Sequence, residues 1–378
     1  GPSGAGKSTL LDLIALRKTD GHWSGDILIN RRPHKPDYNR KCAYVLQDDV
    51  HLPTLSVEET IRYAAWTRMP DSTTASEREA RVQKLMKMMN LEHVAHSWVG
   101  DQLNFRGISG GQMKRLSIAV EIVHLPELIF LDEPTSGLDS SIALEVITAV
   151  KNLSADGRTV ISTIHQPSPE VYALFDKTVL VSAGRVIYSG PADEIVAYFT
   201  APERGYSLNV SSFGINPAEF ALEICAGNLY PNGFTGPRQP VELQDLFNKS
   251  TFFTAAHEPL PQEPPHPTQV FTSSTLTQFR MLLHRGWTGK TRDKRDMVVN
   301  IGKAFVFSIL VGVVMRNVCD VSPPFYDAEG VPTPQINNSS AYLFICLMYN
   351  LMNNMQTITA LAAASVLRRR ELRSYAYS

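Results

Sequence analysis

The stretch GPSGAGKSTLL, residues 1–11, decides the fold. Gly1, Gly6, Lys7 and Ser8 stand at the spacing G-x-x-x-x-G-K-[ST], in which glycines let successive backbone N–H groups point at phosphate oxygens. In this pattern the Lys7 ammonium group reaches the β- and γ-phosphates, and the Ser8 hydroxyl group ligates Mg²⁺. The apolar-periodic run that begins at Ser8 predicts a helix, whose N-terminus adds partial positive charge at the same place. The stretch therefore predicts a nucleoside triphosphate site, without telling which kind of machine uses it.

The bulk composition of the chain excludes several classes of protein. Its 378 residues suffice for two domains or more, and 36 basic against 37 acidic residues give a formal charge of −1. This balance offers no basic field of the size that nucleic-acid binding requires, so we expect no nucleic-acid partner. The 4 cysteines lie far apart without a CxxC pair, which indicates neither a zinc site nor a disulfide framework. Because a phosphate loop normally follows a buried strand, we expect the chain to have been cut within the motif.

Three strand ends further along the chain carry polar side chains suited to phosphate chemistry. CAYVLQ ends at Gln47, LIFLDEPTSGLDS places Asp132 and Glu133 after an apolar strand, and TVISTIHQPS carries His165 at the end of a third. Beside a phosphate loop, Asp132 would lie near Mg²⁺, and Glu133 could position or deprotonate an attacking water. Taken singly, Gln47 and His165 could be solvated or structural, and the two acids could cap a helix. Their place at the ends of strands of one predicted sheet favours a contact between His165 and the γ-phosphate.

A second small-residue turn opens a helix within RGISGGQMKRLSIAVEIV, residues 106–123. Ser109, Gly110 and Gly111 form this turn, which is a second anion-binding helix N-terminus. One ATP rarely needs two such sites in one chain. The turn is therefore expected to serve a nucleotide that a different copy holds.

Together these stretches resemble the nucleotide-binding domain of an ABC transporter. GPSGAGKST looks like its Walker A motif, Gln47 its Q-loop, ISGGQ (108–112) its signature, LIFLDE (128–133) Walker B, SGLD (136–139) the D-loop, and His165 the switch histidine. The resemblance implies an α/β, RecA-like P-loop NTPase fold over residues 1–200, with an inserted helical arm. It implies ATP and Mg²⁺ as ligands, with Glu133, His165 and Gln47 catalytic and Ser8, Gln47 and Asp132 at the metal. The nucleotide contacts that it implies are Gly1, Ser3, Gly4, Ala5, Gly6, Lys7, Ser8, Thr9, Ser109, Gly110, Gly111, Gln112 and Asp139.

Further phrases are similar to subfamily G, the white/brown and pleiotropic-drug-resistance type. They are RGISGGQMKRLSIA, LDEPTSGLDSS, TIHQPS and NPAEF (216–220), with the motor placed before the membrane part. This likeness implies a homo- or heterodimer, in which the Walker residues of one motor face the signature turn of the other. Gln112 stands where the subfamily more often has Glu, and the adenine-stacking residue of the family lies upstream.

Two amphipathic stretches at a 3.6-residue period, VEETIRYAAWTRM and REARVQKLMKMMN, predict helices within the arm of residues 56–125. Their Met and aromatic stripes are interpreted as core. Residues 201–273 are predicted to be an extension and linker, in which 257–269 is either a solvated spacer or a docking motif for a proline-reading partner. A connecting helix is predicted over 274–294. Its mixture of apolar and basic residues favours a location at the cytoplasmic surface of a lipid bilayer.

The region of residues 274–378 is predicted to begin a membrane domain. Spans are predicted at about 297–316 and 340–367, and the basic residues at their outer sequence ends place both of these ends in the cytoplasm. The amides of Asn350, Asn353 and Asn354 share one helix face and serve either as helix–helix glue or as the wall of a substrate path. Asn337 and Asn338 begin sequons near the membrane edge, where glycosylation is not favoured. The end at Ser378 is expected to be a second cut.

The sequence as a whole predicts an integral membrane exporter with a cytoplasmic ATPase motor. Family analogy implies an amphipathic cargo, such as a lipid, sterol or drug-like molecule. The alternatives are a soluble ABC ATPase and a regulatory half that binds ATP without turnover. Without the strand that should anchor its phosphate loop, the chain alone is expected to be a poor ATPase.

Overall fold

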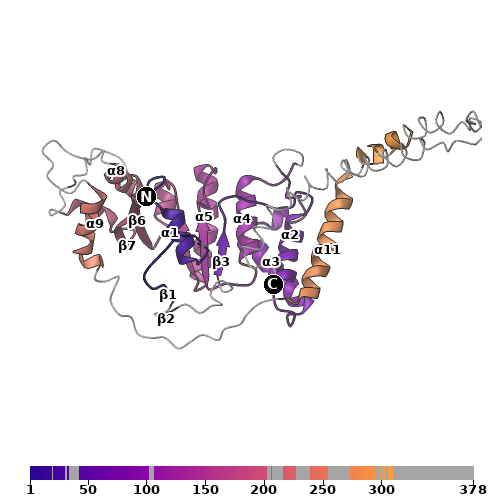
Figure 1. Cartoon of the computed structure of the whole chain (residues 1–378), viewed down its shortest axis with the longest axis horizontal. Helices are drawn as coiled ribbons and strands as arrows, with labels where there is room; N and C mark the ends of the chain where they lie inside the picture. Colours follow the sequence, from indigo (N-terminus) through magenta and orange to yellow (C-terminus); the bar gives the residue numbers. More distant parts are fainter. Residues whose placement is uncertain are drawn as a thin grey trace, which may run out of the picture. The chain divides into compact units, whose positions relative to one another are not determined.

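The computed structural model describes residues 1–18, 20–29, 32–33, 42–101, 106–201, 206, 216–226, 239–253, 273–294, 298–299, 301–303 and 305–309 (Figure 1). These residues fall into two compact units that divide between Met281 and Leu282. The first unit has the α/β content that the sequence predicts for a P-loop NTPase.

The centre of the first unit is a parallel sheet in the order β3-β4-β5. Its strands are β3 (Cys42–Val45), β4 (Leu128–Asp132) and β5 (Thr159–Thr163). Cys42 pairs with Leu128, and Leu128 pairs with Thr159, so the three strands end at one common edge. All three strands were predicted from sequence and are confirmed. DILIN, also predicted as a strand, contributes only β1 (Leu28–Ile29), which pairs with β2 (Arg32–Pro33).

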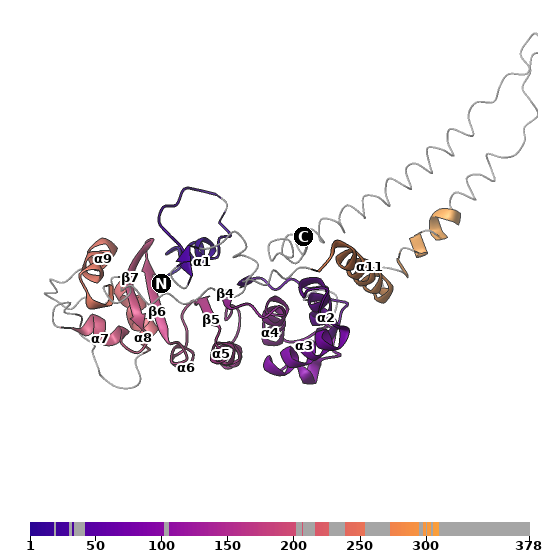
Figure 2. The ribbon, with the colours of Figure 1, turned by 90° about the horizontal axis from the view of Figure 1, so that it is seen from below.

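The two faces of this sheet carry different helices. Ala43 and Val45 of β3 belong to the core that contains α4 (Gly110–Glu121) and α5 (Ser140–Ala155). Tyr44 points the other way, into a smaller core with Phe130 and with Leu11 of α1 (Lys7–Ile14). Alternation along a strand produces this division, because successive side chains point to opposite faces. The helix that follows the phosphate loop and the helix that follows the second small-residue turn therefore lie on opposite faces (Figure 2).

The helical arm contains α2 (Val57–Arg68), α3 (Ala75–Met88) and the short helix η2 (Glu92–Val94). Capping boxes start both long helices: Ser56 pairs with Glu59, and Thr74 pairs with Glu77. Both helices and the core role of the Met stripe are confirmed, since Met86 is among the fully buried residues. Each such large apolar side chain contributes about 1.5–3 kcal/mol on burial.

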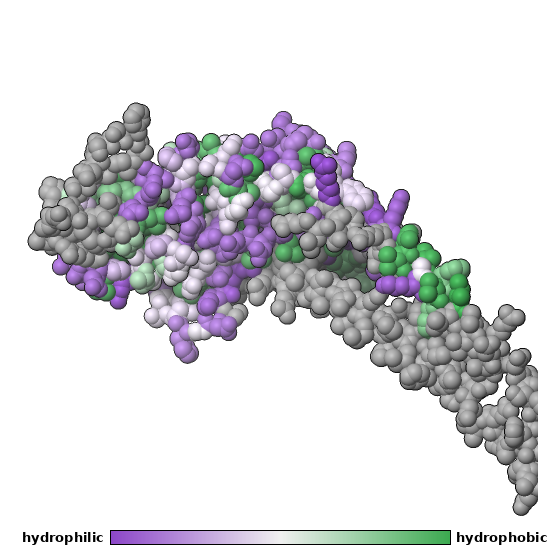
Figure 3. Space-filling model, turned by 90° about the horizontal axis from the view of Figure 1, so that it is seen from above, coloured by the Kyte–Doolittle hydropathy of each residue, from purple (hydrophilic) through white to green (hydrophobic). Residues whose placement is uncertain are grey.

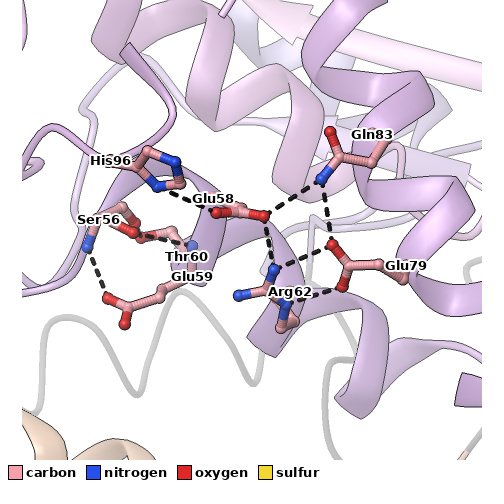
Figure 4. A network of polar contacts seen from close by, with 8 residues as sticks. All are labelled: Ser56, Glu58, Glu59, Thr60, Arg62, Glu79, Gln83 and His96. Carbon is pink, nitrogen blue, oxygen red and sulfur yellow. Dashed lines mark hydrogen bonds and ion pairs between the residues drawn. The ribbon is translucent and has the colours of Figure 1, made fainter. Parts of the chain in front are cut away.

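A polar network ties α2 to α3 on the outer side of the arm (Figure 4). Arg62 donates to Glu58 at 2.6 Å and to Glu79 at 2.9 Å, and the Gln83 amide donates to both carboxylates. His96 lies 3.4 Å from the same Glu58 carboxylate. The Arg62 side chain is 36 % exposed, so solvent screens these ion pairs and their net contribution is small.

A buried ion pair joins the arm to α4. Arg68 donates to Glu121 at 2.7 Å, and both side chains are almost completely buried. Both ring nitrogens of His124 are buried nearby. Burial first, and then the positive charge of Arg68, lower the pKa of His124 from 6.5 to about 4.

This pKa shift predicts that acid destabilises the fold through His124. The ring stays neutral in the folded chain until about pH 4, whereas in the unfolded chain it takes up a proton below 6.5. Stability is therefore complete above pH 6.5 and falls by about 3 kcal/mol as the pH drops toward 4. In thermal unfolding of the full-length protein, His124→Gln should reduce the loss of unfolding temperature between pH 7 and 5. The same change at exposed His22 should not, and equal pH dependence in the two variants would contradict the assignment.

A second core within the first unit lies around an antiparallel pair. Its strands and helices are β6 (Lys177–Ser182), β7 (Arg185–Pro191), α6 (Pro169–Tyr172), α7 (Ile195–Thr200), α8 (Pro217–Ala226) and α9 (Pro240–Asn248). Tyr188 and Phe199 are fully buried, and Phe220 of α8 and Phe247 of α9 pack in the same cluster. Parts of the predicted extension of residues 201–273 are thus built into the fold.

A helix, α11 (Thr275–Arg292), occupies the region predicted for a connecting helix, and its connecting role stays a prediction. Ser273 donates to the Thr67 carbonyl at 2.7 Å, and Ser274 N–H donates to Asp71 at 2.9 Å, so α11 begins directly on the end of α2. Leu276 is 77 % exposed and Trp287 is 72 % exposed.

Little of the predicted membrane domain is described. Within the described residues, the helices are too short or too polar to cross a bilayer. The short helical pieces within 298–309 carry exposed Val, Ile and Phe side chains, which form an apolar surface (Figure 3). Half of span 297–316, the whole of span 340–367, both sequons, the Asn350 face and the Pro-rich segment 257–269 lie outside the described residues.

Candidate functional site

The loop before α1 is bent by glycines. Gly4 and Gly6 have φ angles of 74° and 95°, in the left-handed region that favours glycine. Gly6 is the N-cap of α1, so the backbone turns into the helix directly before Lys7. The Lys7 ammonium group donates to the carbonyls of Gly1 and Pro2, each at 2.9 Å. The loop thus curls around the Lys7 ammonium group at the start of α1, and a role of both in binding phosphate stays a prediction.

The carboxyl edge of the β4–β5 pair lies against the start of α1. The Ser8 hydroxyl donates to Asp132 Oδ1 at 2.9 Å. The Thr163 hydroxyl donates to the same Oδ1 atom at 2.6 Å and accepts from the Glu133 N–H at 2.9 Å. Glu133 adopts a φ of 45°, which is uncommon for a residue other than glycine. Two adjacent acids are therefore fixed, one through its side chain and the other through its backbone.

Gln47 extends this chain of contacts to β3. Its amide Nε2 donates to Glu133 Oε2 at 3.0 Å. The backbone carbonyl of Gln47 accepts from the Lys114 ammonium group of α4 at 2.7 Å. Lys114 also forms an ion pair with Asp49 at 3.0 Å. Because Lys114 is almost completely buried, this ion pair fixes the backbone after β3 against α4.

His165 follows β5 by two residues and is exposed at the same edge. The next residue, Gln166, has a φ of 46°, so the backbone turns sharply there. The structure thus places His165 after the strand end, as predicted. A contact to a γ-phosphate stays a prediction.

The second small-residue turn is a well-capped helix start. The Ser109 hydroxyl accepts from the Gln112 backbone N–H at 3.3 Å, while Oε1 of the Gln112 side chain accepts from the Ser109 backbone N–H at 2.9 Å. The Gln112 amide also lies 3.2 Å from Nε2 of His93 in η2. Asp139 caps α5 through the Ile142 N–H at 2.9 Å. These residues belong to the α4–α5 side of the sheet, opposite to α1.

Close packing at this turn predicts different effects for its two glycines. A Cβ atom on Gly111 would lie 2.2 Å from Cγ2 of Ile142, whereas one on Gly110 would lie 3.4 Å from Leu138. Gly111→Ala is therefore expected to push α4 from α5 and to destabilise the fold by about 1–3 kcal/mol. Gly110→Ala, the matched control, should have a much smaller effect. Thermal unfolding midpoints test this, and equal midpoints would show that the close contact carries no weight.

The oxygen atoms at the sheet edge suit a hard cation. Ser8 and Asp132 bring a hydroxyl and a carboxylate oxygen to 2.9 Å, and the Gln47 side chain contacts the adjacent acid. Among the described residues, no group of three or more His, Cys, Asp or Glu side chains could hold a metal ion. Mg²⁺ needs no such group, because it commonly binds through one or two carboxylates together with substrate phosphates.

The structure thus brings together Ser8, Asp132, Glu133 and Gln47, which the sequence predicted separately. It keeps the turn of residues 109–112 and Asp139 on the other side of the sheet. Sequence reasoning missed Thr163 and Lys114. Thr163 pairs in register with Asp132, and this pairing is visible only in the structure.

The family model and the known proteins that the chain matches all belong to the ABC transporters. Residues 1–136 match the family model described as ABC transporter. The chain is 33% identical over 371 residues to the broad substrate specificity ATP-binding cassette transporter ABCG2 of Sus scrofa, covering 91% of this chain and 54% of that protein. It is 37% identical over 321 residues to ABC transporter G family member 12 of Dictyostelium discoideum, covering 83% and 47%. The ABCG2 protein of Bos taurus is 43% identical over 228 residues, covering 60% and 34%. The chain spans about half the length of these relatives, or less.

Proposed function

Since the chain belongs to subfamily G of the ABC transporters, we propose that it is the ATP-binding and ATP-hydrolysing part of a membrane exporter. One observation carries this proposal. A single chain of hydrogen bonds runs from Ser8 through Asp132, Thr163 and Glu133 to Gln47. It gathers side chains from the phosphate loop and from the ends of three parallel strands at one edge of the sheet, where ligands of open α/β sheets bind.

Each of these side chains has a role in phosphoryl transfer. Lys7 binds the β- and γ-phosphates, while Ser8, Asp132 and Gln47 hold Mg²⁺. When bound, Mg²⁺ neutralises charge on the phosphate oxygens. Glu133 orients the attacking water and accepts its proton. His165, exposed beyond β5, contacts the γ-phosphate.

The motor works as a pair. The turn at Ser109 belongs to the face of the sheet that carries α4, whereas Lys7 begins α1 on the opposite face, which supports a role toward a nucleotide other than the one bound by Lys7 of the same chain. Its N–H groups and hydroxyl instead bind ATP held by the Walker residues of a second, identical or related half. ATP therefore closes the two halves, and hydrolysis reopens them.

The transport part is proposed from α11 and from the sequence beyond it. The helix exposes Leu276, Phe279 and Trp287, and its last turn carries Lys290 and Arg292, a composition suited to the cytoplasmic surface of a bilayer. Contacts of Ser273 and Ser274 join its start to α2, so motion of the arm reaches this helix directly. The cargo is amphipathic, of the lipid, sterol or drug-like class, and the motor faces the cytoplasm.

The test is Mg²⁺-dependent phosphate release by the full-length protein in liposomes. Amphipathic compounds should stimulate this release, and Lys7→Met should abolish it. The protein should also stay in the membrane fraction in high salt. Extraction by high salt would support a soluble ABC ATPase instead, and binding of ATP without phosphate release would support a regulatory half.

A further inference from the structure

We propose that Thr163 is a positioning residue that fixes both acids of the hydrolytic site, an inference that rests on the proposed ATPase function. Thr163 is the last residue of β5 and is 8 % exposed. It pairs in register with Asp132, the last residue of β4. Its side chain therefore lies beside the point where the chain passes from Asp132 to Glu133.

The hydrogen bonds of the Thr163 hydroxyl group define its direction. A hydroxyl carries a single proton, and here the oxygen accepts from the Glu133 N–H at 2.9 Å. The proton is thus directed at Asp132 Oδ1, which lies 2.6 Å away. A threonine is well suited to this task, because its branched Cβ restricts the χ1 angle and keeps the oxygen in place. One group therefore links the side chain of one acid to the backbone of the other.

The contact to Glu133 acts on a strained residue. At a φ of 45°, the Glu133 backbone is in a conformation that non-glycine residues adopt only where their surroundings hold them. This conformation aims the carboxylate at Gln47, which donates to it at 3.0 Å. Loss of the Thr163 oxygen would leave the Glu133 N–H without this partner and would loosen the direction of its side chain.

The contact to Asp132 acts on the metal-binding side. Oδ1 accepts both from Thr163 and from Ser8, so the carboxylate plane is set from two directions. Ser8 is itself one of the proposed Mg²⁺ ligands. If Thr163 is absent, Asp132 keeps only one of these two donors, and its orientation toward the cation is less defined.

Matched variants of β5 separate this role from general stability. Thr163→Val keeps the branched shape but removes the hydroxyl group, whereas Thr163→Ser keeps the hydroxyl group. Thr159→Val makes the same change at the exposed start of the same strand. In the full-length protein, we expect Thr163→Val to lower kcat about 10- to 100-fold. The KM for ATP should change less than about 3-fold, and Thr163→Ser and Thr159→Val should stay near wild type.

A binding measurement supplies a readout that is independent of turnover. With a fluorescent ATP analogue, the Mg²⁺ concentration for half-maximal binding should rise several-fold in Thr163→Val and stay unchanged in Thr163→Ser. Wild-type kcat and Mg²⁺ dependence in Thr163→Val would overturn the inference. Equal loss in Thr163→Ser would do so too, because size rather than the hydroxyl group would then matter.

A further variant of Thr163 and the wild-type protein itself complete the test. If Thr163→Val unfolds at a lower temperature than Thr159→Val, Thr163→Cys replaces it as a near-isosteric variant with a weak donor. An intermediate kcat of Thr163→Cys supports the role, and a wild-type kcat overturns it. Absence of phosphate release in the wild-type protein would instead refute the proposed function, which distinguishes the two failures.

Discussion

Glu133→Gln is expected to lower ATP turnover of the full-length protein by about 10²- to 10³-fold while leaving ATP binding intact. The substitution removes the base but keeps the size of the side chain. It also keeps an oxygen that can accept from the Gln47 amide, which in the wild-type chain donates to Glu133 at 3.0 Å. The proposed contacts of Lys7 to phosphate and of Ser8 to Mg²⁺ do not involve this side chain. Phosphate release in single-turnover experiments and equilibrium ATP binding measure the two effects separately.

The matched control is Glu127→Gln. Glu127 directly precedes β4 and is exposed, whereas Glu133 directly follows the strand. Both variants lose one negative charge at an end of the same strand, so a general charge effect would appear in both. Turnover near wild type in Glu133→Gln would contradict its role as base or water-positioning residue. Joint loss of binding and turnover would show that Glu133 acts on nucleotide affinity instead.

The sequence predicted those residues of the candidate site that stand at the ends of strands. Asp132 and Glu133 follow an apolar run, and Gln47 ends another, so parallel pairing alone brings them to one edge. Thr163 gave no such signal, because threonine is a common strand residue whose partner depends on the register. Lys114 gave no signal either, because a lysine within a helix is usually exposed. Only the tertiary structure shows that it is buried against Gln47 and Asp49.

The fold likewise divides into elements that local sequence signals predict and a core that depends on tertiary structure. The 3.6-residue periodicity predicted α2 and α3, because this signal is local, and the structure adds a capping box at the start of each helix. The second core was not predicted in detail, since its members come from separate segments. Tyr188 lies on β7, Phe199 on α7, and Phe220 and Phe247 on two helices within a stretch rich in Pro, Gly and Ser. Aromatic residues that meet across such distances leave no periodic pattern in the sequence.

We propose that one ATP lies between Lys7 of one half and the Ser109 turn of the other. This arrangement can be tested in mixed dimers, with Glu133→Gln in both halves so that bound ATP is retained. One half carries Lys7→Met, and the other carries Ser109→Asp. Asp is a good N-cap, so α4 keeps its cap, but its charge repels a triphosphate. Ser109→Asn keeps the cap without the charge and is the matched control.

Mixed dimers are isolated through two different affinity tags, one on each half. The number of ATP molecules that each mixed dimer retains is then measured. If each site combines Lys7 of one half with Ser109 of the other, both defects fall on one site and the second stays intact. We therefore expect one retained ATP per mixed dimer, and none in dimers whose halves both carry Lys7→Met or both carry Ser109→Asp. If each half instead built its site from its own Lys7 and Ser109, both sites would be damaged, and a mixed dimer without retained ATP would contradict the account.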